Sequence, residues 1–139
     1  MNLKNYCFSF KSYDQILEIL RICKRNKIKP IFFVSYHLIN GLGVDWLIEL
    51  KNMLINQFNK NDYKFYVDSK RNYGLFIDLV ETKVEFIKIK ANEELCKKLK
   101  QIAKKNKVVI NPSFSVVDLS KNKNKTTKLK KLYKKKIVF

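Results

Sequence analysis

The sequence predicts an α/β fold with parallel strands, because short β-rich runs alternate with segments of helical periodicity along its 139 residues. Hydrophobic residues make up 46% of the chain, which is enough for a buried core. The chain has only three glycines and two prolines, which argues against a turn-dense all-β architecture. The expected order of elements is βαβαβαβαβ.

The first strand and helix are predicted from a β-rich run at residues 6–10 and a capping signal behind it. Ser12 has the right chemistry to cap a helix N-terminus, and Gln15 three residues later completes a capping-box pattern. Apolar residues then recur at helical spacing as far as Cys23. The lysines of residues 24–29 lie where the C-terminus of a helix favours positive charge.

The second strand and helix are predicted from an apolar run and an apolar stripe. Residues 30–35 are almost continuously apolar, which is typical of a buried strand in a parallel sheet. Residues 37–43 are expected to form a loop that leads into the second helix. The apolar stripe of that helix consists of Leu47, Leu50, Leu54 and Phe58.

The second half of the chain repeats this alternation. We expect a turn at residues 59–62, strands at 63–67, 84–89 and 108–110, and helices at 72–81 and after the cap Asn92. Pro112 ends the fifth strand, because a proline restricts the residue before it and cannot donate to a sheet. Beyond it, irregular chain is expected up to an amphipathic turn at residues 128–135.

Five parallel strands and four helices fit two architectures. One is an open, doubly wound sheet of flavodoxin-like strand order, and the other is half of a (βα)8 barrel, with four βα units plus a strand. In the fourth strand, Lys88 and Lys90 share one face and two isoleucines share the other. This alternation suits a strand at a sheet edge or one whose tip opens into a polar site.

Residues 67–74, in which Asp68 ends a strand and Gly74 opens the next helix, precede the hydrophobic strand at 84–89. This arrangement resembles the repeating unit of aldolase-like (βα)8 enzymes. The chain over about residues 29–112 is also similar to a group of small bacterial proteins that look like half-barrels and have no assigned activity. The resemblance implies a half-barrel fold. The turn at residues 81–83 departs from the barrel unit, which often carries a glycine there.

The net charge of +18 divides into two parts. Residues 1–119 are expected to form a single α/β domain, and residues 120–139 a lysine-rich C-terminal tail with nine lysines and no acid. We expect the tail to form a basic patch that binds polyanions without sequence specificity. Its residues are Lys128, Lys130, Lys131, Lys134, Lys135 and Lys136. Because the chain has only three arginines and is rich in residues with A/T-rich codons, a solvated tail in a lysine-biased composition is the alternative.

In parallel α/β folds, ligands bind at the C-terminal ends of the strands. Asp68 and Lys88 are the candidate catalytic residues there, the first as an acid beside cations and the second as a lysine at a strand tip. The anion-binding residues expected at the same edge are Gly41, Gly43, Lys70 and Arg71. Whether the protein is an enzyme is left open.

The cysteines and the single histidine predict no metal site and no cofactor. Cys7, Cys23 and Cys96 are far apart in the sequence, and with His37 they form no zinc-ligand pattern. Each is expected to be a small buried hydrophobe in a reducing compartment. No apolar run approaches the roughly 20 residues of a membrane span, and residues 1–13 lack a signal-peptide pattern. A cytoplasmic protein without a transmembrane segment is therefore expected.

Three functions fit these observations. The first is a small α/β protein that binds a small anionic ligand, such as a phosphorylated one, at the strand ends. The second is a basic accessory protein that binds nucleic acid or the ribosome through the tail and the fourth helix. The third is a non-catalytic scaffold derived from a barrel enzyme. A half-barrel is expected to form a homodimer, because its open sheet leaves edges and an apolar face exposed.

Overall fold

The computed structural model describes residues 6–118 and confirms the α/β class, with one open sheet of six parallel strands. The strands are β1 (Cys7–Ser9), β2 (Ile31–Val34), β3 (Lys64–Asp68), β4 (Phe86–Lys88), β5 (Val109–Ile110) and β6 (Val116–Asp118). The helices are α1 (Tyr13–Arg25), α2 (Tyr36–Leu42), α3 (Val44–Ile55), α4 (Tyr73–Glu81) and α5 (Glu93–Lys105), with a 3-10 turn, η1, at Lys60–Asp62. The predicted turn at residues 128–135 lies outside the described residues.

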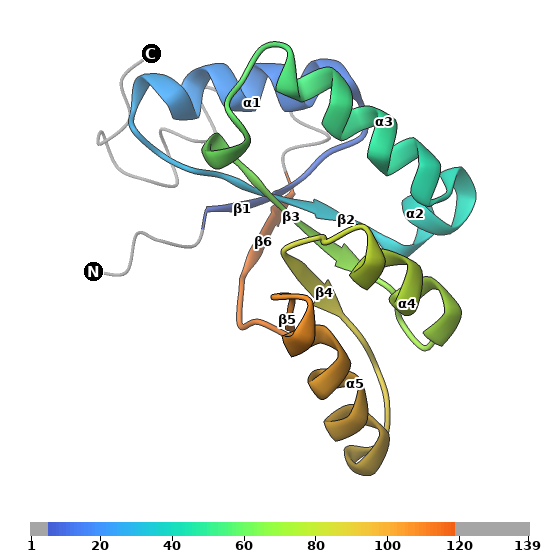
Figure 1. The fold of residues 1–139 in the computed structure, drawn as a ribbon. Helices are drawn as coiled ribbons and strands as arrows, with labels where there is room; N and C mark the ends of the chain where they lie inside the picture. The colour runs from blue at the N-terminus through green and yellow to red at the C-terminus, as the bar shows by residue number, and fades with distance from the viewer. Residues whose placement is uncertain (1–5, 119–139) are drawn as a thin grey trace.

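The strand order is β5-β4-β3-β2-β1-β6 (Figure 1). From β1 to β5, each strand lies beside the next strand of the chain, so the connections all step in one direction across the sheet. A flavodoxin-like sheet has the order 2-1-3-4-5 and reverses direction once. The sheet is therefore open but singly wound. Because the right-handed crossovers from β1 to β5 all step in the same direction, they place their helices on the same face of the sheet.

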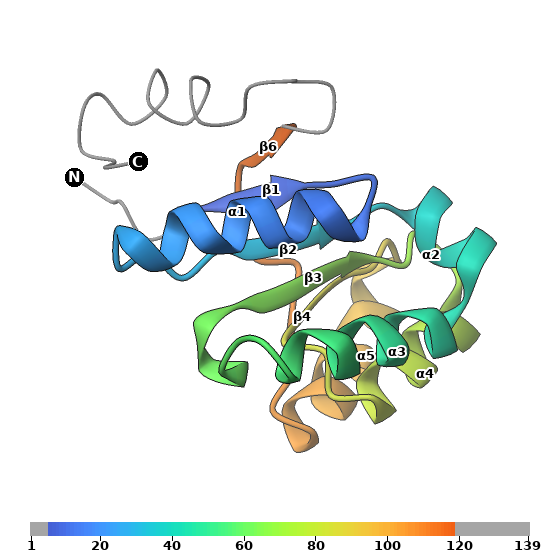
Figure 2. The same ribbon diagram turned by 90° about the horizontal axis from the view of Figure 1, so that it is seen from above.

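One large core joins this face of the sheet to the helices. Phe8, Phe32 and Phe65 come from three neighbouring strands, and all are fully buried. They pack in one cluster with the apolar stripes of all five helices, to which Leu20 of α1 and Leu54 of α3 belong. The helices accordingly follow one another in an arc around the sheet, as Figures 1 and 2 show from two directions.

The other sheet face, called the open face below, carries a separate and smaller cluster. Cys7, Ile31 and Tyr66 are buried there, and three half-buried phenylalanines pack against them. No residue of the described helices belongs to this cluster. Towards the sheet edges, Val109 is 52% exposed and Val116 is 40% exposed. Strand alternation therefore divides the sheet into a face covered by helices and a face that no described helix covers.

The predicted helix caps are confirmed. The side chain of Ser12 accepts a hydrogen bond from the Gln15 amide at 3.3 Å, and Asn92 caps α5 through the Leu95 amide at 2.8 Å. The capping box differs in one detail, because the Gln15 side chain accepts from the amide of Lys11 instead of Ser12. The predicted alternation in the fourth strand is also confirmed, since Lys88 is exposed while Ile87 and Ile89 are buried.

The loop predicted at residues 37–43 is wrong. Most of this segment belongs to helix α2, which begins after Ser35, whose side chain accepts from the Leu38 amide at 3.2 Å. Ile39 of α2 is fully buried in the main core, so tertiary packing stabilises a helix that carries only a weak apolar pattern. Gly43, at φ +86° and ψ 168°, separates α2 from α3.

The predicted order of five strands and four helices lacks two elements that the structure contains, helix α2 and strand β6. Residues 116–118 were expected to be irregular, but they form β6 and pair in parallel with β1. Cys7 lies opposite Val116, and the Ser9 hydroxyl donates to Asp118 Oδ1 at 3.0 Å. A strand of three residues has too few positions for a recognisable alternation, which is why no sequence pattern predicts it.

The cysteine predictions hold for two of the three residues. Cys7 and Cys23 are buried, and burial raises the pKa of each thiol to about 12. Cys96 on α5 is only half-buried. Among the described residues, no group of three or more His, Cys, Asp or Glu side chains could hold a metal ion. No helix in residues 6–118 is long and apolar enough to cross a membrane.

Candidate functional site

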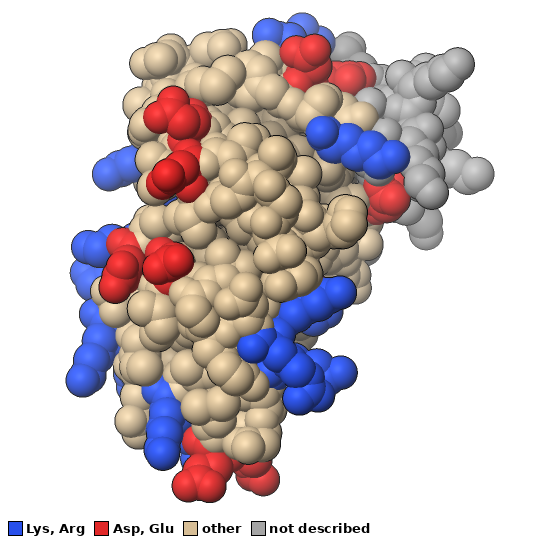
Figure 3. Space-filling model, turned by 90° about the vertical axis from the view of Figure 1, so that its right-hand side faces the viewer, with Lys and Arg blue, Asp and Glu red and all other residues tan. Residues whose placement is uncertain are grey.

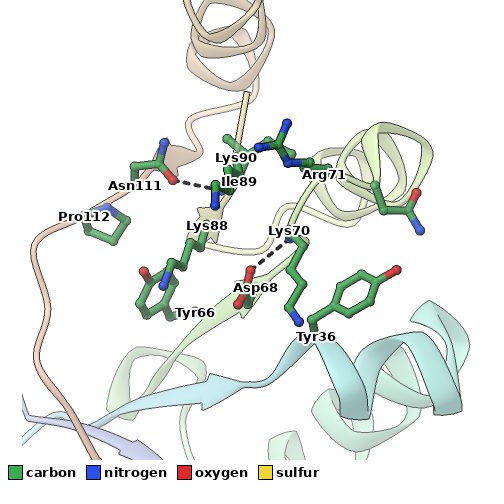
Figure 4. Close-up of a pocket in the computed structure, with 11 residues that line it drawn as sticks. Tyr36, Tyr66, Asp68, Lys70, Arg71, Lys88, Ile89, Lys90, Asn111 and Pro112 are labelled. Carbon is green, nitrogen blue, oxygen red and sulfur yellow. Dashed lines mark hydrogen bonds between the residues drawn. The ribbon is translucent and has the colours of Figure 1, made fainter. Parts of the chain in front are cut away.

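The C-terminal ends of β3, β4 and β5 surround a cavity of about 970 Å³ (Figure 4). Four basic side chains line it, namely Lys70, Arg71, Lys88 and Lys90, together with the carboxylate of Asp68. The first two follow β3, and the other two end or follow β4. The structure thus brings together the four residues that the sequence predicted at the ends of these two strands: Asp68, Lys70, Arg71 and Lys88.

The register of β3 and β4 positions the two strand tips. Asp68 lies directly opposite Lys88. The next residue, Ser69, is fully buried, and both its hydroxyl and its amide donate to the Lys88 carbonyl, at 2.7 and 2.8 Å. The Lys90 amide donates to the Lys70 carbonyl at 2.8 Å. These bonds hold the chain after β3 against the chain after β4 beyond the end of the regular sheet.

A tight turn after β3 directs its basic side chains into the cavity. The Lys70 amide donates to Asp68 Oδ1 at 2.9 Å, and Lys70 itself has a left-handed backbone with φ +48°. Asn72 ends the turn by capping α4, its Oδ1 accepting from the Leu75 amide at 3.0 Å. The Lys70 ammonium then lies over the ring of Tyr36, 5.3 Å from its centroid.

The strand β5 closes the other side of the cavity. Asn111, with φ +50°, donates through its amide to the Ile87 carbonyl at 2.9 Å, and its side-chain oxygen accepts from the Ile89 amide at 2.8 Å. This side-chain bond replaces a sheet bond where β5 ends after two residues. Pro112 follows and adds an apolar wall.

The phenol of Tyr66 lies at the floor of the cavity, where it adjoins the aromatic cluster of the open face. Its ring packs edge-on against Phe33 and Phe114, with centroid distances of 5.2 and 5.8 Å. Burial, and secondarily the nearby Cys7 and Asp68, raises the pKa of Tyr66 to about 12. The phenol is neutral at neutral pH, as a phenol of ordinary pKa also is, and it can donate a hydrogen bond.

The charge around the cavity is predominantly positive. Lys70, Arg71, Lys88 and Lys90 are all exposed, and within residues 6–118 none of them forms an ion pair. Figure 3 views the molecule from the side towards which β2 and β3 point, and it shows a group of Lys and Arg side chains there. Several cations without a paired carboxylate at one concave surface raise the local concentration of anions.

The two glycines predicted to bind an anion do not line this cavity. Gly41 is in the last turn of α2, and Gly43 lies between α2 and α3. Gly43 instead lines a second cavity of about 540 Å³, whose lining includes Asp45 and Asp78. Two carboxylates there are unfavourable for an anion. The predicted polyanion patch, Lys128 to Lys136, lies outside the described residues.

Two tyrosines that the sequence analysis did not name as site residues line the cavity. Tyr66 shares a face of β3 with Asp68, because residues two apart in a strand point to the same side. That spacing was visible in the sequence and could have identified it. Tyr36 lies two residues beyond the end of β2, in the segment 35–43 that the sequence places at the ligand-binding edge, but no pattern singles it out there.

No protein-family model matches this sequence, and no curated protein matches it either. The cavity and its residues are therefore the basis for assigning a function.

Proposed function

We propose that this protein binds a small anionic, phosphorylated ligand at the C-terminal ends of β3 and β4. The observation that carries the proposal is the set of four basic side chains around one cavity of about 970 Å³, without ion-pair partners in the described chain. Arg71 is suited to bidentate contact with phosphate oxygens, and Lys88 supplies a point charge at the strand tip. Asp68 and Lys88 face each other in register, but no reaction is proposed for them.

The test is a titration with ribose 5-phosphate at low salt, followed by calorimetry or by amide chemical shifts. Charge-assisted hydrogen bonds contribute about 1.5–3 kcal/mol each, so the double variant Arg71→Gln/Lys88→Gln should bind at least about a hundredfold more weakly. Lys83→Gln is the matched control, because Lys83 is exposed near the opposite end of β4. An unchanged affinity in the double variant, or equal binding of unphosphorylated ribose, would refute the proposal.

The resemblance to a half-barrel belongs to the same proposal. Successive strands that are neighbours, and helices that pack on one sheet face, are properties of a (βα)8 barrel, in which phosphate groups also bind at the C-terminal strand ends. A cytoplasmic location and a homodimer are likewise proposed. The exposed Val109 and Val116 of the open face support a dimer that covers this face. Light scattering that gives a monomer mass at micromolar concentration would refute the dimer.

A second candidate function is non-specific binding of nucleic acid, favoured by the outer face of α5. Its lysines are all exposed and spaced along one side of a 13-residue helix: Lys97, Lys98, Lys100, Lys104 and Lys105. A filter assay at low salt tests it, with a chain lacking residues 120–139 beside the full chain. Retention that persists in the shortened chain and is lost in a Lys97→Gln/Lys100→Gln/Lys104→Gln variant, with ribose 5-phosphate binding intact, would assign nucleic-acid binding to α5 and separate the two functions. No retention of RNA or DNA by the full chain would exclude this candidate.

A further inference from the structure

The four basic residues account for only part of the candidate cavity. Its remaining wall includes two aromatic rings, Tyr36 and Tyr66, and the apolar residues Ile89 and Pro112. A volume of about 970 Å³ lies near the upper end of the range for small-molecule sites, and it greatly exceeds what a phosphate group needs. The cavity therefore has room for a ligand with a sizeable part besides its phosphate, and aromatic side chains line this room.

The lining groups follow a defined order across the strand tips. Lys88 ends β4, Asp68 ends β3 directly opposite it, and Tyr36 follows the end of the next strand, β2. Neighbouring strands are about 5 Å apart, so the Cα atoms of Lys88 and Asp68 are separated by roughly this distance. Figure 4 shows the same succession, with Asp68 between Lys88 on one side and Tyr36 on the other.

The carboxylate of Asp68 would be unfavourable in a site that binds phosphate alone, since it repels the anion. Its Oδ1 accepts from the Lys70 amide, whereas its second oxygen accepts no hydrogen bond within the described chain. An ionised carboxylate is an acceptor only, so the ligand group beside it is a hydrogen-bond donor. Sugar hydroxyls are such donors, and acidic residues bind ribose hydroxyls in other α/β proteins.

The ring of Tyr36 is held in place beside this carboxylate. The Lys70 ammonium lies over the ring at 5.3 Å, and the Tyr36 hydroxyl donates to Asn40 Oδ1 at 3.4 Å. The side chain is half-buried, so part of it remains accessible from the cavity. A ring that is already held loses little conformational freedom when a planar group stacks on it.

We propose that the ligand is a nucleoside phosphate, which matches this order of groups part by part. Its phosphate binds Lys88, its ribose hydroxyls donate to Asp68, and its base stacks on Tyr36. This inference rests on the proposed function, because it assumes that the basic residues bind a phosphate, and it adds the sugar and the base.

The experiment compares AMP, UMP, ribose 5-phosphate and adenosine as probes of the full chain, by calorimetry at low salt. AMP and UMP should bind at least about tenfold more tightly than ribose 5-phosphate, which is within the range expected for one base stacked on one aromatic ring. Adenosine, which lacks the phosphate, should bind most weakly. The Tyr36→Leu variant should lose the tenfold preference and keep its affinity for ribose 5-phosphate, whereas Tyr36→Phe should retain the preference.

A second variant tests the role of the carboxylate, because its affinities for inorganic phosphate and for AMP should change in opposite directions. Asp68→Ala should bind inorganic phosphate more tightly, because a negative charge is removed, and should bind AMP several-fold more weakly, because the hydroxyl acceptor is lost. A structural defect would lower both affinities. A change of both affinities in the same direction would overturn the assignment of the ribose to Asp68.

The remaining outcomes distinguish the two proposals. Equal binding of ribose 5-phosphate and AMP, or a Tyr36→Leu variant that keeps the tenfold preference, would overturn the nucleoside phosphate and leave the proposed function standing. No binding of any phosphorylated probe, or adenosine binding as tightly as AMP, would overturn the proposed function itself.

Discussion

Replacing Gly41 or Gly43 by alanine should change stability in opposite directions. The sequence suggests one glycine-containing loop, but the structure places the two residues in different backbone conformations. Gly41 lies in the last turn of helix α2, and a Cβ added there would meet no atom within 4 Å outside its own helix backbone and its chain neighbours. Gly43 also has free space for a Cβ, but its φ of +86° and ψ of 168° fall in a region that only glycine adopts readily.

The expected magnitudes follow from these conformations. Gly41→Ala should raise the free energy of unfolding by about 0.5–1 kcal/mol, because alanine loses less backbone entropy than glycine in a helix. Gly43→Ala should lower it by about 1–3 kcal/mol, because an L-side chain is strained at this φ and ψ. For a chain of this length, 1 kcal/mol corresponds to roughly 3–4 °C in the melting temperature, so the variants should melt several degrees apart.

Urea unfolding followed by circular dichroism measures both values, with the wild type and the double variant as references. The two sites flank the end of one helix, so the double variant also shows whether their effects add. If both substitutions lower the free energy of unfolding by similar amounts, then residue 41 is not helical and the original expectation of a loop at residues 37–43 is the correct one. If Gly43→Ala has no effect, the positive φ assigned to the boundary between α2 and α3 is wrong.

Three further predictions concern serine and cysteine side chains. Ser69→Ala should cost about 1 kcal/mol and no more, because the Lys88 carbonyl keeps the Ser69 amide as a donor after the hydroxyl is lost; a loss of 3 kcal/mol in urea unfolding would contradict this. Cys96 should react with a disulfide reagent at pH 8 in the folded protein, while Cys7 and Cys23 should react only on unfolding; equal rates for all three would be the contrary result. Burial raises the pKa of the Cys7 and Cys23 thiols from 9.0 to about 12, so the unfolded state loses these two protons at lower pH than the folded state does. The free energy of unfolding should therefore fall between about pH 9 and about pH 12. Melting temperatures that do not change over this pH range would refute the prediction.

The alternation of strands and helices was predictable because each element carries a local signal. Buried strands are continuous apolar runs, as in β2, and the longer helices carry a cap and an apolar stripe, as in α1 and α5. The two missed elements lack such signals. Helix α2 has seven residues with one fully buried side chain, and β6 has three residues, so both depend on contacts with distant parts of the chain.

The candidate site was predictable in part for the same reason. Asp68, Lys70 and Arg71 are consecutive or nearly so, and residues that follow a strand in a parallel sheet lie at the ligand-binding edge. That Lys88 lies opposite Asp68 depends on the register of β3 and β4, which a sequence does not display. The separation of Gly43 from the basic residues likewise follows from an unforeseen helix, α2.

By itself, the sequence determined the class of fold, the parallel direction of the strands and the identity of several residues at their C-terminal ends. These properties are local, because periodicity, capping and strand composition act over a few residues. The tertiary structure decided the single direction of winding, and with it the face that the helices leave open. It also decided which side chains share one cavity, because strand order and register join residues that are up to 76 positions apart in the chain, from Tyr36 to Pro112.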